Sequence, residues 1–238
     1  MEDFKQYFID MLKELDLMLN NKQIEDFYYY MNELIEWNKN INLTAITEEK
    51  EIIQKHFIDS LTIIKYLKNN DKIIDVGTGA GFPGIPLKIS NETLDITLLD
   101  SLNKRILFLN NVIEKLKLNN IRTIHSRVED AASNLEHREK YDIATSRAVA
   151  QLNVLLEYLL PLVKVGGKCI CMKGGNIEEE LKNSKKALEI LGGKVEKIES
   201  FELPDSDIKR NIIIIKKVSH TPKIYPRKAG TPSKKPLI

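Results

Sequence analysis

A glycine-rich segment that follows a short apolar run contains the first residues able to do chemistry. The run 72–76 leads into Gly77, Gly79 and Gly81, and Asp75 stands just before these glycines. Glycines let the backbone turn sharply and approach a ligand with no Cβ in the way. In an open parallel sheet, ligands bind beside such turns at the carboxyl ends of the strands. The segment therefore predicts a cofactor site.

Two kinds of cofactor compete for this turn. Residues 79–84 match G-x-G-x-x-G, the dinucleotide fingerprint, so a nicotinamide-dependent oxidoreductase is one alternative. Asp75 opposes it, because a carboxylate beside the turn would repel a pyrophosphate at the helix N-terminus. S-adenosylmethionine has no phosphate, and its sulfonium and ammonium groups favour a nearby carboxylate. Asp-x-Gly-x-Gly-x-Gly thus indicates a methyltransferase, with a turn that binds no ligand as the remaining alternative.

Acidic residues after the next two strands extend the predicted site. Asp100 ends the run 94–99, where a carboxylate can accept both ribose hydroxyls, although it could also cap the following helix. After the third strand, Glu129 or Asp130 could accept a hydrogen bond from the adenine amino group. An ordinary helix-start role is an equal alternative for Asp130.

Arg147 ends the fourth strand, at the position that faces the methyl group and the substrate. The Asn/Asp-Pro-Pro-aromatic motif of many amine methyltransferases is missing there, and no cysteine nucleophile is near. A guanidinium pairs with a carboxylate, a phosphate or a guanine edge, and a surface ion pair is the alternative. We expect Cys169 and Cys171 to be buried thiols, and no metal site, because no Cys or His partners stand at zinc spacing.

The hydropathy pattern predicts the elements that position these residues. Residues 1–70 show apolar positions at helical spacing, which predicts an N-terminal helical cap. Its last helix is expected to start after Thr47 and to run to about residue 67. Residues 71–217 alternate β-branched runs with helical segments, which predicts an α/β fold, a Rossmann-like class I methyltransferase with a mostly parallel seven-stranded sheet. The last two strands have no helix between them and suggest an antiparallel pair. The strands are expected at 72–76, 94–99, 121–125, 141–145, 168–172, 194–202 and 211–217.

The C-terminal end is basic. Residues 208–238 have nine Lys and Arg and no acid, so the remaining 207 residues have a net charge of −7. Four prolines in 218–238 predict an extended arm rather than a helix or strand. This arm is either a solvated tail or a phosphate-contacting surface. The candidate RNA contacts are Arg227, Lys228, Lys234 and Lys235.

The N-terminus and the hydropathy pattern predict where the protein works and whether it associates with a membrane or with itself. The N-terminus lacks the layout of a signal peptide, and no apolar run approaches the roughly 18 residues of a membrane span. We therefore expect a cytoplasmic protein without a membrane partner. No long exposed apolar stripe is visible, so a monomer is expected.

Five segments together resemble the small-subunit (16S) ribosomal RNA guanine-N7 methyltransferase G family, also called glucose-inhibited division protein B. The resemblance implies an enzyme that methylates N7 of one guanine in 16S rRNA of the small ribosomal subunit. It also implies cofactor contacts by Gly77, Phe82, Val128, Glu129 and Arg147, and functional roles for Asn42, His56 and Arg227. Phe82 stands where leucine is frequent in the family. The matching segments are 42–44, 56–61, 75–86, 146–148 and 225–237.

N7 of guanine has a free lone pair, so its methylation needs no general base. The absence of an obvious base, metal site or nucleophile fits that chemistry. His56 could instead cap or pack a helix, and Tyr28–Tyr30 are expected to pack rather than to stack on bases. Alternatives are a small-molecule methyltransferase and an RNA-binding module without a cofactor.

Overall fold

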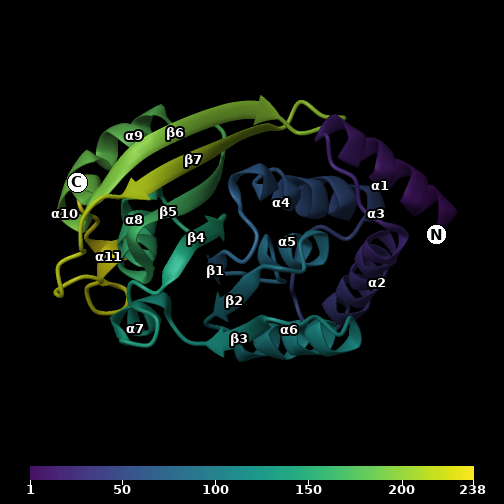
Figure 1. Ribbon diagram of the computed structural model, residues 1–238, viewed down its shortest axis with the longest axis horizontal. Coiled ribbons are helices and arrows are strands. Elements are labelled where there is room, and N and C mark those ends of the chain that lie inside the picture. The colour runs from purple at the N-terminus through teal and green to yellow at the C-terminus, as the bar shows by residue number, and fades with distance from the viewer.

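The computed structural model describes residues 1–238, and its centre is one seven-stranded sheet in the order β3-β2-β1-β4-β5-β7-β6 (Figure 1). Strands β1 to β5 run parallel, and β7 is antiparallel to β5 and β6. This confirms the predicted mostly parallel sheet with an antiparallel end. No helix lies between β6 and β7, and antiparallel strands, unlike parallel ones, need no crossover helix to join them. The strands are β1 Lys72–Val76, β2 Asp95–Asp100, β3 Ile121–His125, β4 Tyr141–Arg147, β5 Val163–Gly174, β6 Gly193–Glu202 and β7 Lys209–Lys217.

Helices cover both faces of the sheet. Helices α5 and α6 lie with the N-terminal helices on one side, and α7 to α10 lie on the other (Figure 1). The bounds are α1 Glu2–Glu14, α2 Asn21–Asn38, α5 Gly84–Ser90, α6 Asn103–Lys115, α7 Val128–Ser133, α8 Leu152–Leu159, α9 Glu178–Asn183 and α10 Lys185–Leu191.

The isoleucine run of β7 shows how the two faces are buried. Ile212 and Ile214 belong to the core beneath the N-terminal helices, whereas Ile213 and Ile215 belong to the core beneath α8 and α10. Successive side chains of a strand point to opposite faces, so a strand covered on both sides is continuously apolar. Cys169 and Cys171 are free, buried thiols in the second core, as predicted.

Aromatic residues join the N-terminal helices to the first core. Phe27 of α2 packs against Phe8 and Phe57, with ring centroids 4.8 and 5.0 Å away. Tyr30 is fully buried in the same core, so the expectation of packing is confirmed for it. This shared core joins the N-terminal helices to the face of the sheet that α5 and α6 also cover. The boundaries 1–70, 71–217 and 218–238 remain predictions.

The helix expected to run to about residue 67 is interrupted, and that expectation was wrong. The chain forms α3 (Glu49–Ile52), a π-helical turn (Ile53–Ile58), α4 (Asp59–Leu61) and a short 3₁₀ turn (Ile64–Tyr66). Such π turns are common at functional sites because they re-aim side chains. Here the turn contains His56.

The C-terminal segment was expected to lack helix, and this too was wrong at one place. Helix α11 (Thr231–Lys234) forms a single turn with Pro232 in its first positions, where a missing N–H group costs nothing. The segment lies beside α7 and α8 (Figure 1). None of the helices is both long and apolar enough to cross a membrane.

Candidate active site

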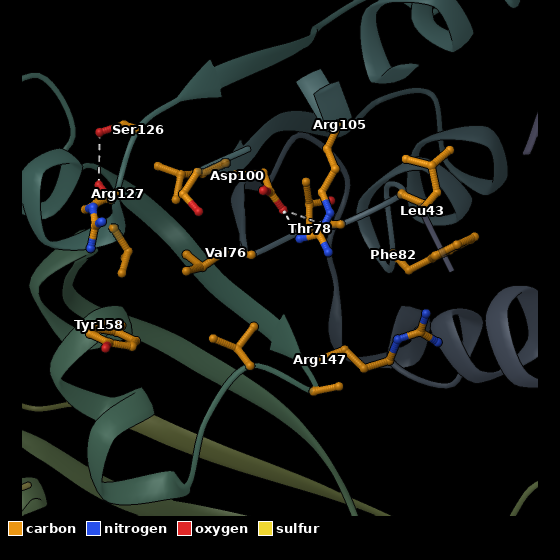
Figure 2. Close-up of a pocket in the computed structure, with 18 of the residues that line it drawn as sticks. Leu43, Val76, Thr78, Phe82, Asp100, Arg105, Ser126, Arg127, Arg147 and Tyr158 are labelled. Carbon is orange, nitrogen blue, oxygen red and sulfur yellow. Dashed lines mark hydrogen bonds and ion pairs between the residues drawn. The ribbon is translucent and has the colours of Figure 1, made fainter. Parts of the chain in front are cut away.

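A cavity of about 600 Å³ lies at the carboxyl ends of β1, β2 and β4 (Figure 2). Its volume is in the range of small-molecule sites. Asp75, Gly81 and Asn42 do not line it. The predicted residues that do line it are His56, Gly77, Gly79, Phe82, Asp100, Val128, Glu129 and Arg147.

Two glycines of the loop after β1 have distinct reasons to be glycine. Gly77 and Gly79 have φ angles of +68° and +63°, which side chains rarely adopt. A Cβ on Gly77 would lie 2.6 Å from a Val149 methyl carbon, so the close approach of the 147–149 loop requires glycine. A Cβ on Gly79 would meet nothing within 4 Å. Gly79 therefore leaves open space beside the cavity.

Asp75 acts behind the loop, not on its cavity side, which differs from the predicted direct contact with the cofactor. Its Oδ2 accepts hydrogen bonds from the Thr78 hydroxyl (2.6 Å) and the Gly84 N–H (2.9 Å). The carboxylate thus fixes both ends of the glycine turn. Burial raises the pKa of Asp75 to about 6, and its Oδ1 has no hydrogen-bond partner. Tyr30 also holds the loop by donating its hydroxyl to the Ala80 carbonyl.

Asp100 orders the turn that follows β2. Its Oδ2 accepts from the Gly79 N–H (2.9 Å) and from Arg105 (3.1 Å), and its Oδ1 accepts from the Leu102 N–H (2.9 Å) before α6. The alternative of a helix cap is not borne out, because the N-cap residue of α6 is Leu102 and the helix has no side-chain cap. Asp100 instead orders the turn ahead of α6 and holds the glycine loop. A carboxylate has about four acceptor positions, so one position on Oδ1 is left for a ribose hydroxyl.

The start of α7 forms the far end of the cavity. Val128 and Glu129 lie in its first turn, where backbone N–H groups have no intrahelical partner. Glu129 is buried, and its Oε1 accepts from the Gly230 N–H (2.9 Å). Tyr158 and Ser233, whose hydroxyls lie 2.9 Å apart, complete this end. Sequence reasoning missed both, because no motif joins residues 75 positions apart.

These groups test whether a nucleoside-containing cofactor fits. The cavity offers open space beside a glycine, free N–H groups at a helix start, and carboxylates with unused acceptor positions at Asp100 and Glu129. A ribose needs acceptors for its hydroxyls, and an adenine needs one donor and one acceptor. The donor set therefore fits S-adenosylmethionine.

Arg147, His56 and Phe82 form a stacked group at the end of the cavity away from α7 (Figure 2 labels Arg147 and Phe82). The His56 ring stacks on Phe82 at 4.4 Å and 15°, and the Arg147 guanidinium lies 5.1 Å from the same ring centroid. Arg147 donates to His56 Nδ1 (3.1 Å), so the Nε2–H donates to the Thr44 hydroxyl (2.9 Å). Burial, then the Arg147 charge, lowers the pKa of His56 to about 3. His56 is therefore a neutral part of the wall.

Arg147 is also held from the helical side. It donates to the Lys55 carbonyl (2.9 Å) and to Asp59 (3.0 Å), whose other oxygen accepts from Arg210 (3.1 Å). The carboxylate of Asp59 is almost fully buried. Sequence reasoning missed Asp59 and Arg210 as partners, since they lie 151 positions apart.

Asn42 lies exposed on a loop outside the main cavity, whereas its neighbours Leu43 and Thr44 line it. The amide of Asn38 holds this loop, because its oxygen accepts from the N–H groups of both Leu43 (2.8 Å) and Thr44 (3.0 Å). The structure therefore brings His56 and Arg147 together but leaves Asn42 apart from them. Asn38, which the sequence did not single out, shapes the loop.

The four C-terminal candidates divide into two kinds. Arg227 donates to the fully buried Glu157 through Nε (2.9 Å to Oε1) and Nη2 (2.6 Å to Oε2). This differs from the predicted phosphate contact, because the guanidinium is committed to a buried carboxylate. Lys228, Lys234 and Lys235 are exposed and form no ion pair within the chain.

The sequence of the chain places it in a family. The sequence model of the family described as rRNA small subunit methyltransferase G, GidB, matches residues 23–213. The chain belongs to the rRNA small subunit methyltransferase G family. It is 60% identical over 220 residues to the ribosomal RNA small subunit methyltransferase G of Acetivibrio thermocellus, covering 92% of this chain and 90% of that protein. It is 52% identical over 240 residues to the protein of the same name from Clostridium novyi, covering 98% and 99%.

Solved structures of more distant proteins show the fold of this methyltransferase G family member. The TYW2 protein of M. jannaschii in complex with AdoMet has a TM-score of 0.55 at 18% identity, covering 68% of this chain and 76% of that chain. The P. horikoshii TYW2 in complex with MeSAdo has a TM-score of 0.54 at 13% identity, covering 66% and 60%. The Rossmann-like α/β fold predicted from the sequence is thereby confirmed.

Proposed function

We propose that this methyltransferase transfers the methyl group of S-adenosylmethionine to N7 of a guanine in 16S rRNA of the small ribosomal subunit. Membership of the methyltransferase G family supports this reaction. The observation in the structure that carries it is the cavity beside Gly79, with its unused donors and acceptors for a nucleoside. The small-molecule alternative has no comparable support.

The residues of the chain hold and align the reactants. We assign the ribose to Asp100, the adenine to the first turn of α7 with Glu129, and the amino-acid end to the loop of Gly77 and Gly79. When bound, S-adenosylmethionine supplies a methyl group that N7 attacks while the carbon–sulfur bond breaks and its electron pair goes to sulfur. No proton leaves N7, so the wall of Phe82, His56 and Arg147 needs only to exclude water and fix the approach.

The substrate side of the proposal rests on exposed charge. Lys228, Lys234 and Lys235 lie on the segment that borders the cavity at Gly230 and Ser233, so they would hold RNA phosphates beside the adenine end of the cofactor site. We further propose that the enzyme works as a cytoplasmic monomer. The arm of residues 218–238 would act as an RNA-facing part beside the catalytic domain of residues 71–217, and the helical cap of residues 1–70 would be packed on that domain.

A methyl-transfer assay tests the proposal. Purified protein and methyl-labelled S-adenosylmethionine are incubated with small ribosomal subunits that lack the modification, and the RNA is digested for nucleoside analysis. Label in N7-methylguanosine of 16S rRNA is expected. Label in another nucleoside, or none while the cofactor still binds, would contradict the proposed reaction.

A further inference from the structure

A second cavity, of about 420 Å³, adjoins the first at the wall formed by His56, Arg147 and Ala148, which line both. It lies beyond the carboxyl ends of β4 and β5, on the opposite side of that wall from the ribose and adenine positions. Because the two cavities share these lining residues, a group that accepts a methyl from the first cavity can approach it through their common boundary. We propose that the second cavity receives the target guanine base, and that Lys173 and Glu180 read its O6, N1–H and N2–H groups. This inference rests on the proposed function.

The polar groups of this cavity are arranged as a donor beside an acceptor. Lys173 at the end of β5 donates to the Ala150 carbonyl (2.8 Å) and lies 2.7 Å from Glu180 Oε2 on α9. The same oxygen accepts from the Leu152 N–H (2.8 Å), so two groups fix the carboxylate. Glu180 Oε1 has no hydrogen-bond partner within the chain, and one proton of the Lys173 ammonium is also unused.

Asp59, the other acid of the cavity, is not available in the same way. Its two oxygens accept from Arg147 and Arg210, and its side chain is only 3% exposed. The carboxylate of Glu180 is 23% exposed. Glu180 is thus the acid of this cavity that can accept a hydrogen bond from a ligand.

The pattern matches the Watson–Crick edge of guanine. That edge presents an acceptor, O6, and then two donors, N1–H and N2–H, which a lysine ammonium and a carboxylate complement. Adenine presents a donor and then an acceptor at that edge. Its donor would face the lysine ammonium, which is also a donor, and its acceptor would face the carboxylate, which is also an acceptor. N7 lies on the other side of the purine, so a base held by Lys173 and Glu180 turns N7 away from them and toward the boundary with the first cavity.

The carboxylate would also favour the reaction itself. Methylation moves a positive charge from sulfur to the purine, and this charge acidifies N1–H. A hydrogen bond from N1–H to Glu180 therefore strengthens as the reaction proceeds, which stabilises the transition state more than the bound substrate. Loss of Glu180 should lower kcat as well as raise KM.

Glu180→Gln is the test, because the amide oxygen can still accept from Leu152 N–H while its NH₂ group opposes guanine N1–H. Glu179→Gln is the matched control, since Glu179 is an exposed neighbour on α9. The substrates are small subunits reconstituted with guanosine or inosine at the position that the wild type methylates. Inosine keeps O6 and N1–H but lacks the 2-amino group.

We expect Glu180→Gln to lower kcat/KM on guanosine by about 10- to 100-fold, the effect of one charged hydrogen bond, with S-adenosylmethionine affinity unchanged. The wild type should prefer guanosine to inosine by roughly 10-fold, and the variant should have lost this preference. Glu179→Gln should behave as the wild type. If Glu180→Gln misfolds, Glu180→Asp, which keeps the charge but shortens the reach, should show a reduced guanosine preference.

Three results would overturn the inference. They are a guanosine preference that survives in Glu180→Gln, a guanosine preference that survives in a Glu180→Asp enzyme used in its place, and a loss of kcat/KM matched by an equal loss of cofactor affinity. Each leaves the proposed function intact, because the wild type still methylates. A wild type that labels no ribosomal RNA would refute the proposed function and the inference together.

Discussion

Replacing Arg227 by alanine should destabilise the protein by several kcal/mol, although Arg227 lies near the C-terminus. Glu157 is fully buried on α8, and the Arg227 side chain is 25% exposed. Two side-chain hydrogen bonds and the Arg227 backbone N–H (2.8 Å) hold the carboxylate. Breaking a buried pair on one side costs about 3–5 kcal/mol, because a charge is left unpaired. We expect about 3 kcal/mol, since the backbone bond remains.

Denaturant unfolding and thermal melting measure this cost. For a chain of this size, about 3 kcal/mol corresponds to a fall in Tm of roughly 6–12 °C. Lys228→Ala is the control, because its exposed side chain has no ion-pair partner and should change stability by less than about 0.5 kcal/mol. In a Glu157→Gln background, Arg227→Ala should cost only about 1 kcal/mol, the value of a neutral hydrogen bond.

The same substitution should weaken cofactor binding, because Gly230 and Ser233 follow Arg227 and line the cavity. Calorimetry with S-adenosylmethionine would detect this. The reasoning would be refuted if Arg227→Ala and Lys228→Ala had equal effects on stability, or if the cost of Arg227→Ala were the same with and without the Glu157 charge.

Three further predictions concern the cofactor loop, the wall and the basic segment. Gly79→Ala adds a Cβ that faces the cavity, so it should lower S-adenosylmethionine affinity at least 10-fold. It should also cost about 1–2 kcal/mol of stability, because the residue has a φ angle of +63°. A cofactor titration that matches the wild type would contradict this. The pKa of His56 is about 3 in the folded protein and about 6.5 in the unfolded chain, so the free energy of unfolding should fall as the pH drops below 6.5. Between pH 7 and pH 5, the wild type should lose about 2 kcal/mol more stability than His56→Asn in denaturant unfolding. Equal losses would contradict a buried neutral ring. Changing Lys228, Lys234 and Lys235 together to Ala should reduce the slope of log K for RNA against log salt by about 2–3, whereas an unchanged slope would exclude phosphate contacts there.

Local sequence patterns were enough to predict the sheet and the position of the cofactor loop. The alternation of β-branched runs and helical segments is written in consecutive residues, and so is the turn of Gly77 and Gly79 with positive φ angles. Such features depend on backbone preferences over a few residues. The family resemblance predicted the reaction and a functional role for His56. The residues that contact His56 could not be predicted from any local pattern.

The tertiary structure alone decided what each side chain touches. Asp75 lies on the same face of β1 as Ile73, beneath α5, so its carboxylate holds the loop from behind and does not face the cavity. Arg227 was interpreted as a free cation because Glu157, 70 positions earlier, gives no sign in the sequence that it is buried. Burial and ion pairing between distant segments are set by packing, because the cost of an unpaired buried charge exceeds any local preference. Local sequence patterns therefore determine the fold class and the position of the cofactor loop, whereas packing decides which charged residues are available to a ligand.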